Sequence, residues 1–226
     1  MAKEITIALA GNPNAGKTTV FNNLTGARQH VGNWPGVTVE KKEGTCHYQD
    51  YTIKVVDLPG VYSLTAYSLD EVIARNFIVE GKPDLVVQIV DASNIERNLY
   101  LTTQLLELGI NLVLALNMSD VSESRGHQID IEQLSSLLGI PVVHMVASRN
   151  DGTKELLNEV VRAAEGQAEA RRFKIDYGTE VEEEIAKLED LISKDGELCQ
   201  RYSPRWLAIK LLEEDEEVIR VIKGHG

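Results

Sequence analysis

Eight consecutive residues near the N-terminus have the types and the spacing that hold phosphate groups. They read Gly11-Asn-Pro-Asn-Ala-Gly-Lys-Thr18 and match the pattern G-x-x-x-x-G-K-[ST]. Glycines allow backbone conformations that point successive N–H groups at one phosphate, and a helix beginning near Lys17 adds its positive N-terminal end. Lys17 is expected to reach the β- and γ-phosphates, and Thr18 to offer its hydroxyl to Mg²⁺. The motif predicts a nucleotide site but does not indicate which base is bound.

The second motif is Asp57-Leu-Pro-Gly60, which follows a strand-like run, Tyr51–Val56. A carboxylate at the end of a strand can hold Mg²⁺ through water. The Gly60 N–H can meet a γ-phosphate, so the segment after it is expected to move when that phosphate leaves. In related nucleotide hydrolases a glutamine after this motif orients the attacking water, whereas this chain has Val61, which predicts slow hydrolysis.

Thr38 lies between these two motifs, at the end of the 31–38 segment, Val31-Gly-Asn-Trp-Pro-Gly-Val-Thr38. A threonine here can ligate Mg²⁺ through its hydroxyl and meet the γ-phosphate through its N–H in the triphosphate state. Pro35 and Gly36 suit a segment that orders and disorders. Trp34 either shields the nucleotide or contacts a partner, and both readings stay open.

Two further segments predict which base is bound. Asn117-Met-Ser-Asp120 follows the apolar run Leu112–Leu116 and resembles N-K-x-D, in which the aspartate accepts two hydrogen bonds from guanine. Adenine lacks both donors, so the site would reject it. Met118 replaces a lysine that normally packs over the base, which predicts weaker nucleotide binding. In Val146-Ala-Ser148, the Ala147 N–H is expected to contact the guanine carbonyl oxygen.

The residues expected to contact the nucleotide come from all five segments. They are Gly11, Asn12, Pro13, Asn14, Ala15, Gly16, Lys17, Thr18, Thr19, Gly36, Val37, Thr38, Asp57, Gly60, Asn117, Met118, Asp120, Val146, Ala147 and Ser148. Among them, Thr18, Thr38 and Asp57 are the predicted Mg²⁺ ligands, and Lys17, Thr38 and Gly60 are expected to act on the reacting phosphate.

Composition narrows the class of protein. The chain has 226 residues and a formal net charge of −12, which disfavours general binding to nucleic acids. A ribosome- or tRNA-associated GTPase is therefore a weaker alternative, and Asp120 counts against an ATP-dependent enzyme. No signal peptide and no apolar run of membrane-spanning length is visible, so the chain itself is expected to be soluble and cytoplasmic. Self-association stays open.

The elements that must position these motifs alternate between strand-like and helix-like patterns up to about Ala164. This alternation predicts an α/β, doubly wound, mostly parallel sheet with its ligand at the carboxyl ends of the strands. A capping box is expected at Ser68, before the helical pattern of residues 72–79. Helical patterns without strands follow after Gly166, with a second capping box expected at Thr179. We expect a nucleotide-binding domain over residues 1–168 and a small helical subdomain over residues 169–226.

These motifs together resemble the N-terminal cytosolic GTPase region of the FeoB ferrous-iron transport family. The resemblance is carried by the phosphate motif, by Val31–Glu40, Asp57–Ser63, Glu96–Gln104 and Asn117–Asp120, and by Arg205–Leu212 in the helical tail. Methionine at the position of Met118 is usual in that family. The match covers essentially the whole chain.

The resemblance implies a GTP-binding protein that hydrolyses GTP to GDP and phosphate, with its helical subdomain steadying bound GDP. It also implies stimulation by K⁺, with Asn14 helping to hold the ion beside the phosphates. The family's full-length protein continues into a membrane permease. We therefore expect this chain to be the regulatory part of a ferrous-iron transporter, on the cytoplasmic side of the cell membrane.

Overall fold

A single mixed sheet forms the centre of the nucleotide-binding region in the computed structural model, which describes residues 3–65, 67–166 and 174–224. In that part of the chain seven strands lie in the order β2-β3-β4-β1-β5-β6-β7. Their bounds are β1 Lys3–Gly11, β2 Gln29–Asn33, β3 Glu40–Tyr48, β4 Tyr51–Asp57, β5 Leu85–Asp91, β6 Leu112–Asn117 and β7 Val142–His144. The pairings from β4 to β7 are parallel, whereas β2-β3 and β3-β4 are antiparallel. The predicted α/β fold with a mostly parallel sheet is confirmed.

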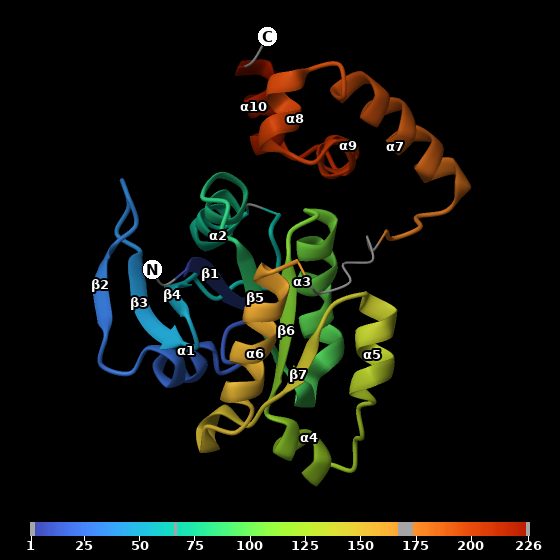
Figure 1. The fold of residues 1–226 in the computed structure, drawn as a ribbon. Coiled ribbons are helices and arrows are strands. Elements are labelled where there is room, and N and C mark those ends of the chain that lie inside the picture. Colours follow the sequence, from blue (N-terminus) through green and yellow to red (C-terminus); the bar gives the residue numbers. More distant parts are fainter. Residues whose placement is uncertain (1–2, 66, 167–173, 225–226) are drawn as a thin grey trace.

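Helices cover both faces of this sheet (Figure 1). Helices α1 (Lys17–Thr25) and α6 (Thr153–Ala164) pack on one face, and α2 (Leu69–Glu80), α3 (Ile95–Glu107) and α5 (Ile131–Leu138) pack on the other. Successive strand residues point to opposite faces, so strands covered on both sides are apolar throughout.

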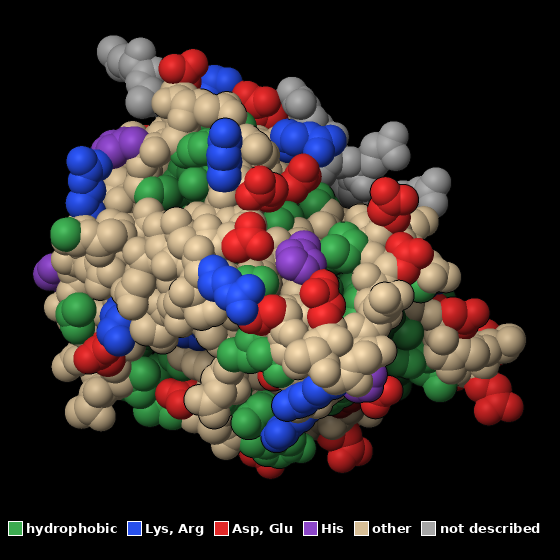
Figure 2. Space-filling model, turned by 90° about the horizontal axis from the view of Figure 1, so that it is seen from below, with side chains coloured by type: hydrophobic (Ala, Val, Ile, Leu, Met, Phe, Trp, Pro, Cys, Tyr) green, Lys and Arg blue, Asp and Glu red, His purple; other side chains and the backbone are tan. Residues whose placement is uncertain are grey.

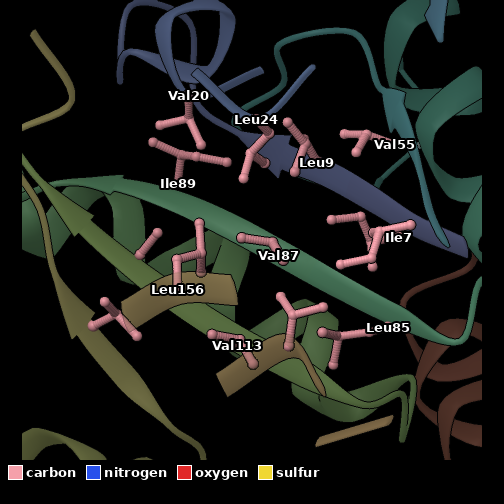
Figure 3. Packing of buried hydrophobic residues seen from close by; sticks show 14 of the residues in the cluster. Ile7, Leu9, Val20, Leu24, Val55, Leu85, Val87, Ile89, Val113 and Leu156 are labelled. Carbon is pink, nitrogen blue, oxygen red and sulfur yellow. The ribbon is translucent and has the colours of Figure 1, made fainter. Parts of the chain in front are cut away.

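Strand β1 shows this alternation. Ile7 and Leu9 belong to the buried cluster with α1 and α6, whereas Ala8 and Ala10 belong to the cluster on the opposite face. Figure 3 shows Ile7 and Leu9 within the first cluster, together with residues of β4, β5, β6, α1 and α6.

The C-terminal helices have a hydrophobic cluster of their own. They are α7 (Thr179–Ile192), α8 (Gly196–Arg201), α9 (Pro204–Leu212) and α10 (Glu216–Gly224). Their cluster includes the buried Trp206 and Leu207, and Leu108 packs against it. These helices lie at the opposite end of the molecule from α4 (Ser119–Ser124) (Figure 1). The predicted boundary between residues 168 and 169 falls outside the described residues.

One of the two predicted capping boxes is present. The Ser68 hydroxyl accepts from the Glu71 N–H, and the Glu71 carboxylate accepts from the Ser68 N–H, so α2 begins as predicted. The prediction for Thr179 is wrong, because Gly178 caps α7 without a side-chain hydrogen bond. Glu182 instead accepts from Arg205 at 2.7 Å, so a tertiary ion pair takes the carboxylate that the local motif would have used.

The 31–38 segment also differs from expectation at both ends. Its first residues belong to β2, an exposed strand whose residues lack the alternation of apolar and polar types that would have revealed it. The pattern of residues 37–48 would predict a strand from Val37, but the strand that forms, β3, begins at Glu40. Gly36 has φ of +76°, and the Val37 N–H donates to the Trp34 carbonyl, so a turn occupies the positions before β3.

Within the described ranges, none of the helices combines the length and the hydropathy that crossing a bilayer requires.

Candidate nucleotide-binding site

The phosphate motif connects β1 to α1 at the carboxyl edge of the sheet. β1 ends at Gly11, and α1 begins at Lys17 directly after Gly16. Gly16 has φ of +91°, and a Cβ added there would lie 2.2 Å from Asn117 Nδ2, so a larger residue does not fit. A Cβ on Gly11 would lie 2.6 Å from the Ile89 carbonyl oxygen. Close packing against β5 and β6 thus explains both glycines.

Lys17, at the end of the phosphate motif, forms an ion pair with Asp57. β1 and β4 are parallel neighbours, and Leu9 lies opposite Asp57, so the two strands end side by side. The side chains of Lys17 and Asp57 are only 11% and 8% exposed. A shielded carboxylate beside the phosphate-binding loop, with the Thr18 hydroxyl on the adjoining first turn of α1, is the oxygen donor set that Mg²⁺ prefers.

The backbone after Asp57 lies directly against the phosphate motif. The Val61 N–H donates to the Gly11 carbonyl at 3.1 Å. A Cβ on Gly60 would lie 3.4 Å from Pro13 Cα, which shows how closely the two backbones approach. Val61 is buried. The structure therefore brings Gly60 to the phosphate loop, as the motif predicts.

Asn117 joins the phosphate loop to the segment after β7. Its Nδ2 donates to the Ala15 carbonyl at 2.9 Å, and its Oδ1 accepts from the Ala147 N–H at 2.9 Å. Its side chain is almost fully buried. Sequence reasoning expected Asn117 at the nucleotide but did not foresee this bridge. The Ala147 N–H, expected at the guanine carbonyl oxygen, has Asn117 as its partner here.

Asp120 lies on the first turn of α4, just beyond the end of β6. Met118, in the left-handed conformation with φ of +58°, turns the chain between Asn117 and this helix. Asp120 Oδ1 accepts from the Val121 N–H, and Oδ2 lies 3.3 Å from Arg149 Nη2. Its side chain is 30% exposed, so the predicted base-reading carboxylate is accessible.

The segment after β7 folds into a short turn. The N–H and carbonyl groups of Val146 and Asp151 bond to each other, which closes a turn over Ala147–Arg149. Asn23 of α1 donates to the Ala147 carbonyl at 2.8 Å. Val146 and Ala147 are buried in this turn, whereas Ser148 is exposed.

Sequence reasoning missed Asn23 and Arg149. Asn23 is a single polar residue in a helix, and its bond to Ala147 crosses 124 positions of the chain. Arg149, in the turn after β7, contacts Asp120, in the helix after β6. Neither residue belongs to a recognisable motif, so no local signal marks it.

The structure places Gly36, Val37 and Thr38 in the turn before β3, where the Val37 N–H donates to the Trp34 carbonyl. Trp34 is buried and packs edge-on against Phe77 of α2, with ring centroids 5.3 Å apart. This position supports neither a nucleotide shield nor an exposed docking residue.

The remaining residues of the phosphate motif take different positions. Asn12 is buried and donates to the Arg97 carbonyl at 3.4 Å. Asn14 has φ of +66° and an exposed side chain that makes no hydrogen bond to any other residue the structure describes, and Thr19 is also exposed. The Asn14 carboxamide oxygen is thus available to a cation.

The face seen in Figure 2 carries interspersed Lys, Arg, Asp and Glu side chains. On this face the described basic side chains do not form an extended basic surface, which agrees with the net charge of −12.

Comparison with known proteins finds a matching family model for each of the two parts of the chain. The model of the family described as ferrous iron transport protein B matches residues 5–160, and that of the FeoB cytosolic helical domain matches residues 177–226. The Fe(2+) transporter FeoB of Salmonella choleraesuis is 49% identical over 217 residues, which are 94% of this chain and 27% of that protein. The chain thus spans about a quarter of the length of such curated relatives.

Solved structures of a FeoB cytosolic domain resemble this chain over almost its whole length. The cytosolic domain of the T. maritima FeoB iron transporter has a TM-score of 0.91 in a GDP form and 0.90 in a GMPPNP form. Each is 44% identical to this chain and covers 96% of it, and the chain covers 84% of each. The chain described here belongs to the ferrous iron transport protein B family, and it matches the N-terminal domain and the cytosolic helical domain of that family.

Proposed function

We propose that this chain binds GTP and GDP with Mg²⁺ and hydrolyses GTP to GDP and phosphate. The observation that carries the proposal is the Asn117 bridge, because it connects the phosphate loop at Ala15 to the base end of the site at Ala147. The Lys17–Asp57 pair marks the phosphate end, and Asp120 supplies the carboxylate that selects guanine. The GDP and GMPPNP forms of the T. maritima relative support this assignment.

Thr18, Thr38 and Asp57 would hold Mg²⁺, which shields phosphate charge when bound. Lys17 binds the β- and γ-phosphates, and the Gly60 N–H meets the γ-phosphate. Val61 offers no side-chain hydrogen bond to a water molecule, so hydrolysis is slow. The exposed Asn14 carboxamide would hold a K⁺ ion that adds positive charge beside the phosphates.

Phosphate release from GTP by the purified chain tests the enzymatic proposal. Lys17→Ala should abolish turnover, and Asp120→Asn should shift preference from guanosine towards xanthosine nucleotides, because the amide can donate to the xanthine oxygen. Turnover of ATP at the rate of GTP, or an Asp120→Asn variant with unchanged base preference, would contradict it.

We further propose that the chain is the regulatory part of a ferrous-iron transporter, with a membrane permease in the same full-length protein on whose cytoplasmic side it lies. The helical part, residues 169–226, would steady bound GDP. The length of the curated relatives supports this proposal. Ferrous-iron uptake by cells that carry the full-length protein should fall with Lys17→Ala, and unchanged uptake would argue against a regulatory role.

A further inference from the structure

The Glu96–Gln104 segment has entered the site so far through one contact, the bond from the Asn12 side chain to the Arg97 carbonyl. It forms most of α3, which packs on the sheet beside β5. Two of its polar side chains, Arg97 and Gln104, are directed at one stretch of chain, the 61–65 segment, which follows Gly60. This convergence indicates a role that neither phosphate binding nor base recognition explains.

Gln104 makes the buried contact. Its Oε1 accepts from the Leu64 N–H at 2.7 Å, and the two residues are 6% and 2% exposed. Leu64 follows Gly60 by four positions. A buried N–H group that loses its acceptor cannot bond to water unless the chain moves, and leaving it unsatisfied costs free energy. The bond to Gln104 therefore holds the 61–65 segment in place.

Arg97 makes the second contact, nearer the phosphate loop. Its guanidinium carbon lies 4.1 Å from the centroid of the Tyr62 ring, and its own carbonyl accepts from the Asn12 side chain. In the described part of the chain Arg97 forms no ion pair with a carboxylate, so the Tyr62 ring is the partner of its charge. Arg97 and Gln104 are seven residues apart, on one face of the helix.

Two further contacts of the 61–65 segment come from elements other than α3. The Val61 N–H bonds to the Gly11 carbonyl, and the Ser63 hydroxyl donates to Glu71 of α2 at 2.5 Å. α3 therefore supplies the contacts at Tyr62 and Leu64, one on each side of the Ser63 contact with α2.

We infer that Arg97 and Gln104 are positioning residues that hold the 61–65 segment so that the Gly60–Val61 backbone faces the γ-phosphate. They act through Tyr62 and Leu64 and do not touch the nucleotide. The inference rests on the proposed GTPase function, since it names the residues that hold in place the segment next to the reacting phosphate.

Steady-state kinetics provide the first test. Gln104→Met keeps the length of the side chain but removes the acceptor, and it should lower kcat for GTP about tenfold, with KM within about twofold of wild type. Thr103→Ala is the matched control on the same helix, because the Thr103 hydroxyl bonds to the Tyr100 carbonyl within α3. This control should keep the wild-type kcat.

A pair of Tyr62 variants tests the contact with Arg97. Tyr62→Phe keeps the ring and should retain wild-type kcat, whereas Tyr62→Leu removes it and should lower kcat about two- to fivefold, the effect of an exposed cation–π contact. Arg97→Met should match Tyr62→Leu, and combining these two changes should add nothing further.

Amide hydrogen exchange of the nucleotide-free chain gives a readout that does not require turnover. Gln104→Met should accelerate exchange at residues 61–65 and leave β1 unchanged. Wild-type exchange at 61–65 together with wild-type kcat would overturn the inference. A variant that loses GDP affinity in parallel with kcat would also overturn it, because that pattern indicates a general structural role. If the wild type does not hydrolyse GTP, the proposed function fails, and the exchange result still decides whether α3 orders this segment.

Discussion

Arg75 of α2 and Asp215 at the start of α10 form a buried ion pair, with Nη1 and Oδ2 2.8 Å apart and side chains 3% and 5% exposed. Asp215 also accepts from the Glu217 and Val218 N–H groups, so it caps α10. The helix that follows the 61–65 segment is thus joined to the helical part by a shielded contact. Removal of one partner leaves a buried charge uncompensated.

Arg75→Met should therefore lower the free energy of unfolding by about 3–5 kcal/mol. It should also speed GDP dissociation if the helical part steadies GDP. Thermal unfolding and release of a fluorescent GDP analogue measure the two effects. Arg220→Met is the control, since the exposed Arg220–Glu217 pair contributes about 0–1 kcal/mol. Equal effects of the two variants would contradict the importance of the buried pair.

Asn117→Ala should weaken binding of GDP about tenfold or more, because it leaves the Ala147 N–H without its buried acceptor and frees the loop at Ala15. Titration with GDP and with xanthosine diphosphate measures the loss, which should be similar for both bases. Ser124→Ala serves as control, because the exposed Ser124 hydroxyl bonds only to the Val121 carbonyl of its own helix among the described hydrogen bonds. A loss confined to guanine would mean that Asn117 reads the base directly.

GTP turnover in K⁺ and in Na⁺ tests the proposed role of Asn14. The wild type should be several-fold faster in K⁺, since a K⁺ ion beside the phosphates stabilises developing charge. Asn14→Ala should abolish the difference and leave the Na⁺ rate unchanged. Equal wild-type rates in the two salts would exclude K⁺ stimulation.

The raised pKa of Glu107, at the end of α3, predicts that the free energy of unfolding depends on pH. Burial raises the pKa of Glu107 to about 7, although nearby Lys210 and Arg205 oppose the shift and Glu213 adds to it. Its carboxylate accepts a hydrogen bond from Tyr177. The folded chain therefore keeps a proton that the unfolded chain has released, so the stability contributed by protonated Glu107 is lost as pH rises through about 7.

The melting temperature should accordingly fall between about pH 4.5 and about pH 7, and Glu107→Gln should reduce this fall. Differential scanning calorimetry over this pH range checks it. Glu184→Gln, at an exposed surface pair, should leave the wild-type slope unchanged. A Glu107→Gln variant with the wild-type slope would show that another group titrates.

Residue types and short spacings were enough to predict the elements and motifs that local chemistry encodes. The phosphate loop, Asp57 at the end of β4, Asn117 at the end of β6 and the capping box at Ser68 all depend on residue type and short spacing, and the structure places each where the sequence predicts. The roles of all the predicted nucleotide and metal contacts, Thr38 and Asn14 included, stay predictions, because they depend on a bound ligand.

Contacts between residues far apart in the sequence became known only from the packing of the folded chain. β2 pairs at an exposed edge without a periodic pattern, Trp34 is buried against Phe77, and Glu182 pairs with Arg205 in place of capping α7. The Asn117 bridge and the Gln104 bond to Leu64 join segments brought together by the packing of strands and helices. Their energies depend on burial and on partners remote in sequence, which a local pattern does not contain.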